Sequence, residues 1–195
     1  FQAVVAPPVK EKMPIWLAAL REKLTRMAVE IGDGVIGHPM WSVDWTVNTM
    51  KPAIEDELRK RNRQRSDIEV NIWPWAVPSS NEKEALDDAR PTIAFYAGVK
   101  EYESYFEAHG FLKEARALQK VLIEDGFLKA APLVPDEMVK AFIAVGDPDK
   151  VREQIEPVWS VADSICVIPP IYAMTPEKLM YYSEMISKTF APDSL

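Results

Sequence analysis

The 195-residue chain has a single cysteine, Cys166, so it cannot form an internal disulfide bond. A lone thiol is typical of proteins from reducing compartments, and we expect a cytoplasmic location. No run of about 18 apolar residues is present, so we expect no membrane-spanning helix. The first residues lack the charged and apolar regions of a signal peptide, and Phe1 is not an initiator methionine, as expected of a chain that begins inside a longer protein.

Positive charge is also scarce, because 23 Lys and Arg residues face 30 Asp and Glu residues and leave a net charge of −7. Basic residues concentrate only at positions 59–65, where the end of an expected helix favours cations. A nucleic-acid-binding protein needs a basic face, so we expect no nucleic-acid partner. Two histidines and one cysteine, far apart, predict no metal site. No Walker A, Rossmann or G-x-S-x-G motif occurs.

What the sequence does contain is an alternation of short apolar runs and helical patterns. Four apolar or β-branched runs predict buried strands, at residues 14–20, 34–37, 68–77 and 164–170. Helical patterns follow each of them, at residues 21–30, 45–63, 82–98 and from Thr175 onward, with Thr175 as N-cap and Pro176 in the first turn. This order predicts an α/β fold with parallel strands and right-handed crossovers.

Prolines and glycines divide the middle of the chain. Pro74 predicts a bend or a bulge in the third strand, because proline cannot donate to a strand ladder. Ser79 or Ser80 is expected to cap the helix that follows, and Pro91 to kink or break it. The pattern then stays helical to Val145, with interruptions on the way, so we expect a helical insert over about residues 82–145. A turn at 145–150 leads into one more helix, to about residue 158.

Three segments together resemble the luciferase-like monooxygenase superfamily, whose members bind FMN or the deazaflavin F420. They are residues 15–35, with Gly32-Asp33-Gly34 similar to the family's A-D-G; residues 144–151, with Val145-Gly146-Asp147-Pro148 similar to V-G-[TD]-P; and residues 162–167. Their order matches the family's C-terminal half. The resemblance therefore implies one partial domain over residues 1–195, the C-terminal half (strands 5–8 with helices) of a (β/α)8 TIM barrel with an extra helical insert after strand 7.

The resemblance also implies where the cofactor lies, at the C-terminal ends of the strands. Expected cofactor-binding residues at these ends are Ala18, Ala19, Leu20, Arg21, Lys23, Gly37, Pro39 and Trp75. The turn at Ala19–Lys23 is similar to the family's phosphate-binding loop, in which Gly-Pro usually stands where this chain has Arg21-Glu22. Glu22 would repel an anion, which Arg21 and Lys23 could offset. Phosphate binding and an ordinary charged helical turn both stay open.

Other side chains each have a functional and a structural interpretation. His38 follows a strand directly and is the candidate catalytic residue, as a hydrogen-bond donor or proton shuttle, or else a packed loop histidine at the pocket rim. Trp41, Trp45, Trp73 and Trp75 could form a wall for a flat cofactor or an apolar substrate, or they could belong to the core or to an interface. His109 is expected at a helix end, and Cys166 as an inert, buried thiol in mid-strand.

Two functional hypotheses follow. In the first, the chain is part of an F420- or FMN-dependent oxidoreductase or monooxygenase acting on a small organic substrate, with F420 favoured because residues 82–145 look like the deazaflavin-type relatives. Four parallel strands would leave two open edges, so we expect as partner the N-terminal half of the barrel, from the same protein or a separate chain, or a second copy of this chain. In the second, the half-barrel self-associates without catalysis and holds a flavin or nothing.

Overall fold

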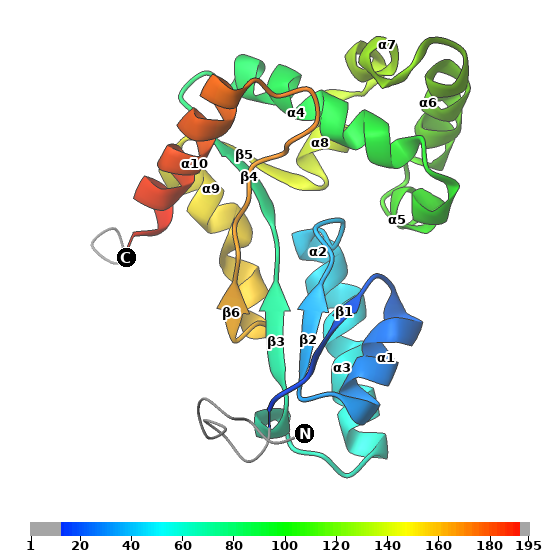
Figure 1. Ribbon diagram of the computed structural model, residues 1–195, viewed down its shortest axis with the longest axis vertical. Helices are drawn as coiled ribbons and strands as arrows, with labels where there is room; N and C mark the ends of the chain where they lie inside the picture. Colours follow the sequence, from blue (N-terminus) through cyan, green and yellow to red (C-terminus); the bar gives the residue numbers. More distant parts are fainter. Residues whose placement is uncertain (1–12, 192–195) are drawn as a thin grey trace, which may run out of the picture.

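The computed structural model describes residues 13–191, whose strands form two parallel sheets (Figure 1). The larger sheet has the order β1-β2-β3-β6 and the smaller pairs β4 with β5. The strands are β1 (Trp16–Ala19), β2 (Gly34–Gly37), β3 (Glu69–Ile72), β4 (Trp75–Pro78), β5 (Ile143–Gly146) and β6 (Ser164–Ile165). Every pairing is parallel, which confirms the predicted α/β class with parallel strands.

Helices follow the strands and also form a layer beyond them. They are α1 (Glu22–Ile31), α2 (Val43–Trp45), the π-helical turn η1 (Thr46–Met50), α3 (Lys51–Lys60), α4 (Glu82–Ala97), α5 (Glu103–Ala108), α6 (Leu112–Asp125), α7 (Phe127–Ala130), α8 (Asp136–Lys140), α9 (Pro148–Ile155) and α10 (Pro176–Phe190). Short 3-10 turns are η2 (Arg65–Asp67), η3 (Lys100–Tyr102), η4 (Ala131–Leu133) and η5 (Glu156–Ser160). None of the helices within residues 13–191 is long and apolar enough to span a bilayer.

The predicted third strand is bent where Pro74 stands. Trp73 and Pro74 separate β3 from β4, which confirms the expected bend. Beyond the bend, the N–H of Ile168 donates to the Pro74 carbonyl at 3.1 Å, and the N–H of Ala76 donates to the Ile168 carbonyl at 3.0 Å. The predicted fourth strand at 164–170 is therefore shorter than expected: β6 ends at Ile165, and only an isolated bridge at Ile168 continues the pairing.

The helix boundaries match several predictions and correct others. Thr175 caps α10 by accepting a hydrogen bond from the Lys178 N–H at 3.3 Å, as predicted. The cap of α4 is Asn81, whose side chain accepts from the Glu84 N–H, so the prediction of a serine cap is wrong. Asn is as good a cap as Ser, and the sequence offers both in a row. Helix α4 continues through Pro91, so of the kink or break predicted there the break is wrong and the kink stays a prediction.

A second correction concerns the end of the helical insert. Helices α4 to α8 confirm its helical character up to Lys140, but Ile143–Gly146 forms β5 rather than helix. A four-residue apolar run has no periodicity that separates a buried strand from a buried helix, so the sequence pattern did not indicate that this segment is a strand. Opposite β4, Gln154 completes β5: its amide accepts from the Val145 N–H at 3.2 Å and donates to the Val145 carbonyl at 2.9 Å.

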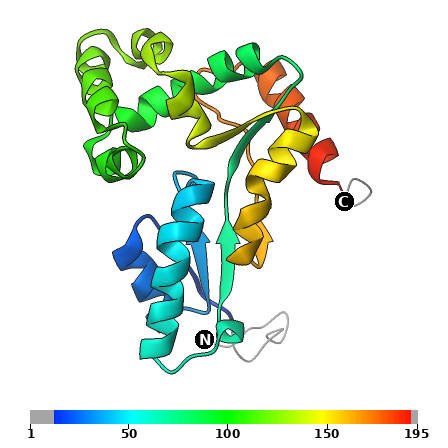
Figure 2. The same cartoon turned by 180° about the vertical axis from the view of Figure 1, so that it is seen from behind.

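The two faces of the larger sheet are unequally covered. Figure 2 shows α3 and α9 lying over one face, where Val35, Val70 and Ile72 are fully buried. Figure 1 looks onto the opposite face, which no helix within residues 13–191 covers. The register places Trp16 beside Gly34 there, and the Trp16 side chain is 39% exposed. The helical insert lies beyond the carboxyl ends of β1 and β2 (Figure 1).

Candidate functional site

A pocket of about 450 Å³ lies at the carboxyl ends of β1 and β2. We call it the strand-end pocket. Its walls are almost entirely apolar and come from both strands, from α1, from the bend after β3 and from η3 of the insert: Ala18, Ala19, Leu20, Leu24, Ile36, Gly37, His38, Pro39, Trp73 and Tyr102. A largely apolar cavity of this size with few polar groups is typical of small-molecule sites.

The structure brings together most of the predicted site residues around this pocket. Ala18, Ala19, Leu20, Gly37, His38 and Pro39 all line it. Arg21 and Lys23 do not: both are exposed at the start of α1. Trp75 lies elsewhere, 3% exposed, between the aromatic core and a second pocket. Sequence reasoning missed Tyr102, because only the folding of the insert brings it to the strand ends.

His38 extends from the end of β2 against aromatic rings. Its Nδ1 accepts a hydrogen bond from the Met40 N–H at 3.1 Å, and its Nε2 lies 3.5 Å from the Tyr102 hydroxyl oxygen. The Tyr96 ring meets the imidazole edge-on, with centroids 5.7 Å apart. Burial lowers the pKa of His38 below its ordinary value, so the ring is neutral at neutral pH.

The four tryptophans divide between the two interpretations. Trp73 lines the strand-end pocket, and its indole N–H donates to the Asn71 amide oxygen. Trp41 is buried behind Gly37 and donates to the Leu20 carbonyl at 2.9 Å, so it supports the pocket wall from outside. Trp45 packs against Tyr105 and His109, and Trp75 is buried. Trp73 is thus the one of the four that faces the pocket.

The first turn of α1 stands next to this pocket through Leu24. Arg21 is the N-cap residue, and no side chain caps the helix. Glu22, whose charge would oppose an anion, is paired with Arg26 at 2.8 Å. That ion pair offsets part of the repulsion, and the turn keeps two exposed cations, Arg21 and Lys23.

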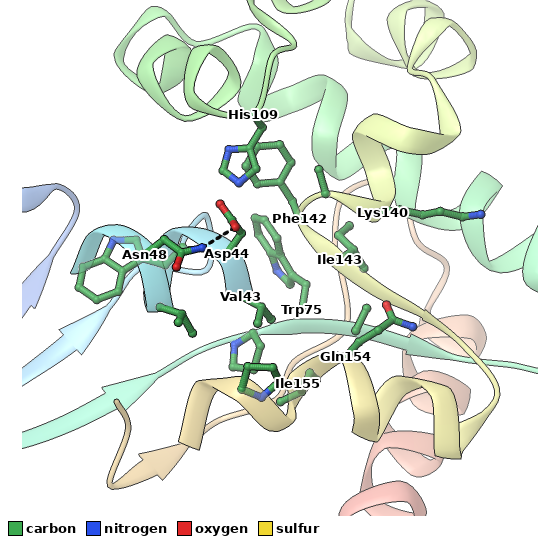
Figure 3. Close-up of a pocket in the computed structure, with 16 residues that line it drawn as sticks. Val43, Asp44, Asn48, Trp75, His109, Lys140, Phe142, Ile143, Gln154 and Ile155 are labelled. Atoms are coloured by element: carbon green, nitrogen blue, oxygen red, sulfur yellow. Dashed lines mark hydrogen bonds between the residues drawn. The ribbon is translucent and has the colours of Figure 1, made fainter. Parts of the chain in front are cut away.

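A second pocket of about 470 Å³ lies on the other side of Trp75, between α2, β5 and α9 (Figure 3). Its polar side chains are already hydrogen-bonded or ion-paired within the protein. Asn48 donates to Asp44 at 2.7 Å, and Lys140 points away toward Glu82, 2.7 Å distant. His109 follows α5, as predicted.

Both ring nitrogens of His109 are occupied. Its Nδ1 lies 2.6 Å from the Tyr105 carbonyl, and its Nε2 lies 2.7 Å from the Ser42 hydroxyl. His109 therefore links α5 to the start of α2 and leaves no free nitrogen for a ligand in the second pocket.

Cys166 departs from expectation, because it lies just after β6 and is half-buried rather than enclosed in mid-strand. Its N–H donates to the Ile72 carbonyl at 2.8 Å. Within residues 13–191, no group of three or more His, Cys, Asp or Glu side chains is placed to hold a metal ion.

Sequence comparison gives relatives that are longer than this chain. An uncharacterised protein of Mycobacterium tuberculosis is 27% identical over 167 residues, which are 78% of this chain and 49% of that protein. The 5,10-methylenetetrahydromethanopterin reductase of Methanopyrus kandleri is 26% identical over 145 residues, 74% of this chain and 41% of the reductase. The chain thus spans about half the length of the curated relatives it matches.

Solved structures show the same fold. The coenzyme F420 dependent tetrahydromethanopterin reductase from Methanopyrus kandleri superposes with a TM-score of 0.68 at 24% identity, over 91% of this chain and 51% of that one. An F420-dependent secondary alcohol dehydrogenase superposes with a TM-score of 0.62 at 14% identity, over 95% of this chain and 50% of that one. The model of the luciferase-like monooxygenase family matches residues 1–161. The chain belongs to the luciferase-like monooxygenase family.

Proposed function

We propose that this chain is the C-terminal half of a (β/α)8 barrel, with its strands in the places of strands 5 to 8 and residues 82–145 inserted after strand 7. The uncovered face of the larger sheet supports this proposal. Parallel sheets are ordinarily buried on both faces, and in a barrel the inner face packs against the opposite strands. Here that face leaves Trp16 39% exposed and Ala18 open to solvent.

The function that this geometry supports best is that of an F420-dependent oxidoreductase acting on a small organic substrate. The observation that carries it is the strand-end pocket, an apolar cavity at the carboxyl ends of parallel strands, where barrel enzymes hold their ligands. Two of the curated relatives are named as 5,10-methylenetetrahydromethanopterin reductases, and a third is named as a putative coenzyme F420-dependent oxidoreductase of Mycobacterium tuberculosis, 26% identical over 166 residues.

The residues present fit such a cofactor. Trp73 and Ile36 offer flat and apolar surface to a tricyclic ring. The uncapped start of α1, with Arg21 and Lys23, offers N–H groups and positive charge to a phosphate. When bound, F420 exchanges a hydride with the substrate, whereas FMN would also allow chemistry with oxygen. The chain's own part is to orient the ring, hold the phosphate and exclude water.

The cofactor assignment is tested by titrating the protein with F420 and, separately, with FMN, and following absorbance and fluorescence. Ala18→Phe fills the pocket from an exposed position, and we expect it to abolish binding. Ala117→Phe, an equal change on the exposed side of α6, is the control and should leave binding intact. Tight binding of FMN without binding of F420 would mean that FMN, and not F420, is the cofactor. Binding without oxidation of the reduced cofactor by any substrate would favour the non-catalytic alternative.

The uncovered sheet face needs a partner, and we propose the N-terminal half of the barrel, within the same protein or as a separate chain. A second copy of this chain is the competing occupant. Sedimentation of the chain alone and with a co-expressed N-terminal half of a relative separates them. Ile36→Asp, on the uncovered face, should abolish the association, whereas Glu55→Ala, exposed on α3, should not. A chain that stays monomeric and does not bind the N-terminal half would contradict the half-barrel proposal.

A further inference from the structure

Three of the side chains that line the strand-end pocket carry polar atoms, those of His38, Trp73 and Tyr102. The Trp73 indole N–H is already donated to Asn71. The backbone carbonyl of Leu20, at the same rim, is occupied by the Trp41 indole. What the pocket walls can offer a ligand therefore depends on where the protons of His38 and Tyr102 lie.

The backbone decides the tautomer of His38. The Met40 N–H points at Nδ1 from 3.1 Å, and two donors cannot face each other at that distance, so Nδ1 is unprotonated. A neutral imidazole then carries its proton on Nε2, the nitrogen 3.5 Å from the Tyr102 oxygen. Nε2 donates, and the Tyr102 oxygen accepts. The hydroxyl proton of Tyr102 is consequently not directed at His38.

We propose that Tyr102, supplied by the helical insert, is the hydrogen-bond donor of the strand-end pocket, and that His38 positions its proton toward the bound ligand. His38 is thus a positioning residue rather than a base. Within the described residues, the hydroxyl of Tyr102 has His38 as its hydrogen-bond partner, which leaves its proton for an acceptor in the pocket. This inference rests on the proposed function of the same site.

The chemistry of the walls defines the ligand group that Tyr102 would meet. Burial, with a smaller effect from Glu101, raises the pKa of Tyr102, so its hydroxyl stays protonated, and none of the described side chains that line the pocket is an acid, a lysine or an arginine. A carboxylate or ammonium would lose its hydration there without an opposite charge. The pocket therefore favours an uncharged oxygen acceptor on an apolar body, such as a ketone or aldehyde carbonyl.

The test compares two ligands of nearly equal shape, acetophenone and α-methylstyrene, in which C=CH2 replaces C=O. Their dissociation constants are measured by calorimetry for the wild-type protein and for Tyr102→Phe. One neutral hydrogen bond changes affinity by roughly fivefold. We expect the preference for the ketone to fall by about that factor in Tyr102→Phe. Tyr181→Phe, on the exposed side of α10, is the matched control and should leave the preference unchanged.

His38→Asn separates positioning from packing, because the Asn oxygen can still accept from the Met40 N–H but cannot reach Tyr102. We expect it to lose part of the ketone preference while its affinity for α-methylstyrene is unchanged. Nitrogen NMR of the ring gives a readout that needs no ligand: a proton on Nδ1 of His38 would overturn the inference. If Tyr102→Phe kept the preference for the ketone, the inference about Tyr102 would be wrong but the proposed function would stand. If the wild-type protein bound neither F420 nor acetophenone, the proposed function would be wrong as well.

Discussion

The covered and uncovered faces of the four-stranded sheet are made by the same strands in the same register, yet most of their side chains differ in burial. Val35 and Val70 lie side by side and are fully buried beneath the helices. One position along, Ile36 pairs with Asn71 and both are only half-buried. A strand alternates its side chains between faces, so the helices bury most of one set and leave most of the other set half-buried or exposed. Helices thus pack mainly against one face of the larger sheet.

The largest effect should come from a matched pair of isoleucines on the two faces. Ile72→Ala removes a fully buried side chain from the covered face and should lower the free energy of unfolding by about 2–5 kcal/mol. Ile36→Ala makes the same chemical change on the uncovered face and should cost less than about 1 kcal/mol. Urea unfolding measures both. Equal losses would mean that the uncovered face is packed in solution.

Two glycines sharpen the comparison at smaller cost. A Cβ on Gly37 would come within 2.7 Å of the buried Trp41 ring, so Gly37→Ala should destabilise the chain by about 1–3 kcal/mol. A Cβ on Gly34 would approach Trp16 as closely, at 2.5 Å, but that indole lies on the uncovered face and can swing aside. Gly34→Ala should therefore be near neutral in thermal unfolding. A large loss there would show that the Trp16 ring is fixed.

The smallest effect concerns His38, where the uncovered face continues into the strand-end pocket. Because burial lowers the pKa of His38, the unfolded chain binds this proton at higher pH than the folded chain does. Stability contributed by the neutral ring is present above pH 6.5 and declines as the pH falls below it. The difference in unfolding free energy between wild type and His38→Asn should shrink over that range. A difference independent of pH would mean that the ring is solvated.

Local signals were sufficient for the parts of the fold that are defined by neighbouring residues. The bend at Pro74 and the cap at Thr175 both follow from the chemistry of one side chain and its own backbone. The strand β5 was not predictable in this way, because Ile143–Gly146 becomes a strand only by pairing with β4, more than sixty residues earlier. Short apolar runs take their structure from such distant partners.

In the candidate site, too, some residues could be placed from local sequence and others could not. His38 and Gly37 stand directly after a strand, so their place at the carboxyl edge of the sheet could be read from the sequence. Trp75 does not line the strand-end pocket, because the bend at Pro74 turns the chain after Trp73 and places the next indole in the core. Tyr102 carried no local signal at all, since its contact with His38 spans 64 residues and depends on how the insert folds.

The two hydrogen bonds between the Gln154 side chain and the Val145 backbone limit where another strand could pair with this chain. One amide satisfies both a donor and an acceptor that an incoming strand would need, so the ladder cannot grow past β5 at that point. Among the described residues, no side chain is hydrogen-bonded in this way to the outer edges of β1 and β6, the outermost strands of the larger sheet. A polypeptide that extended the larger sheet would therefore pair along β1 or β6, in the plane of the sheet.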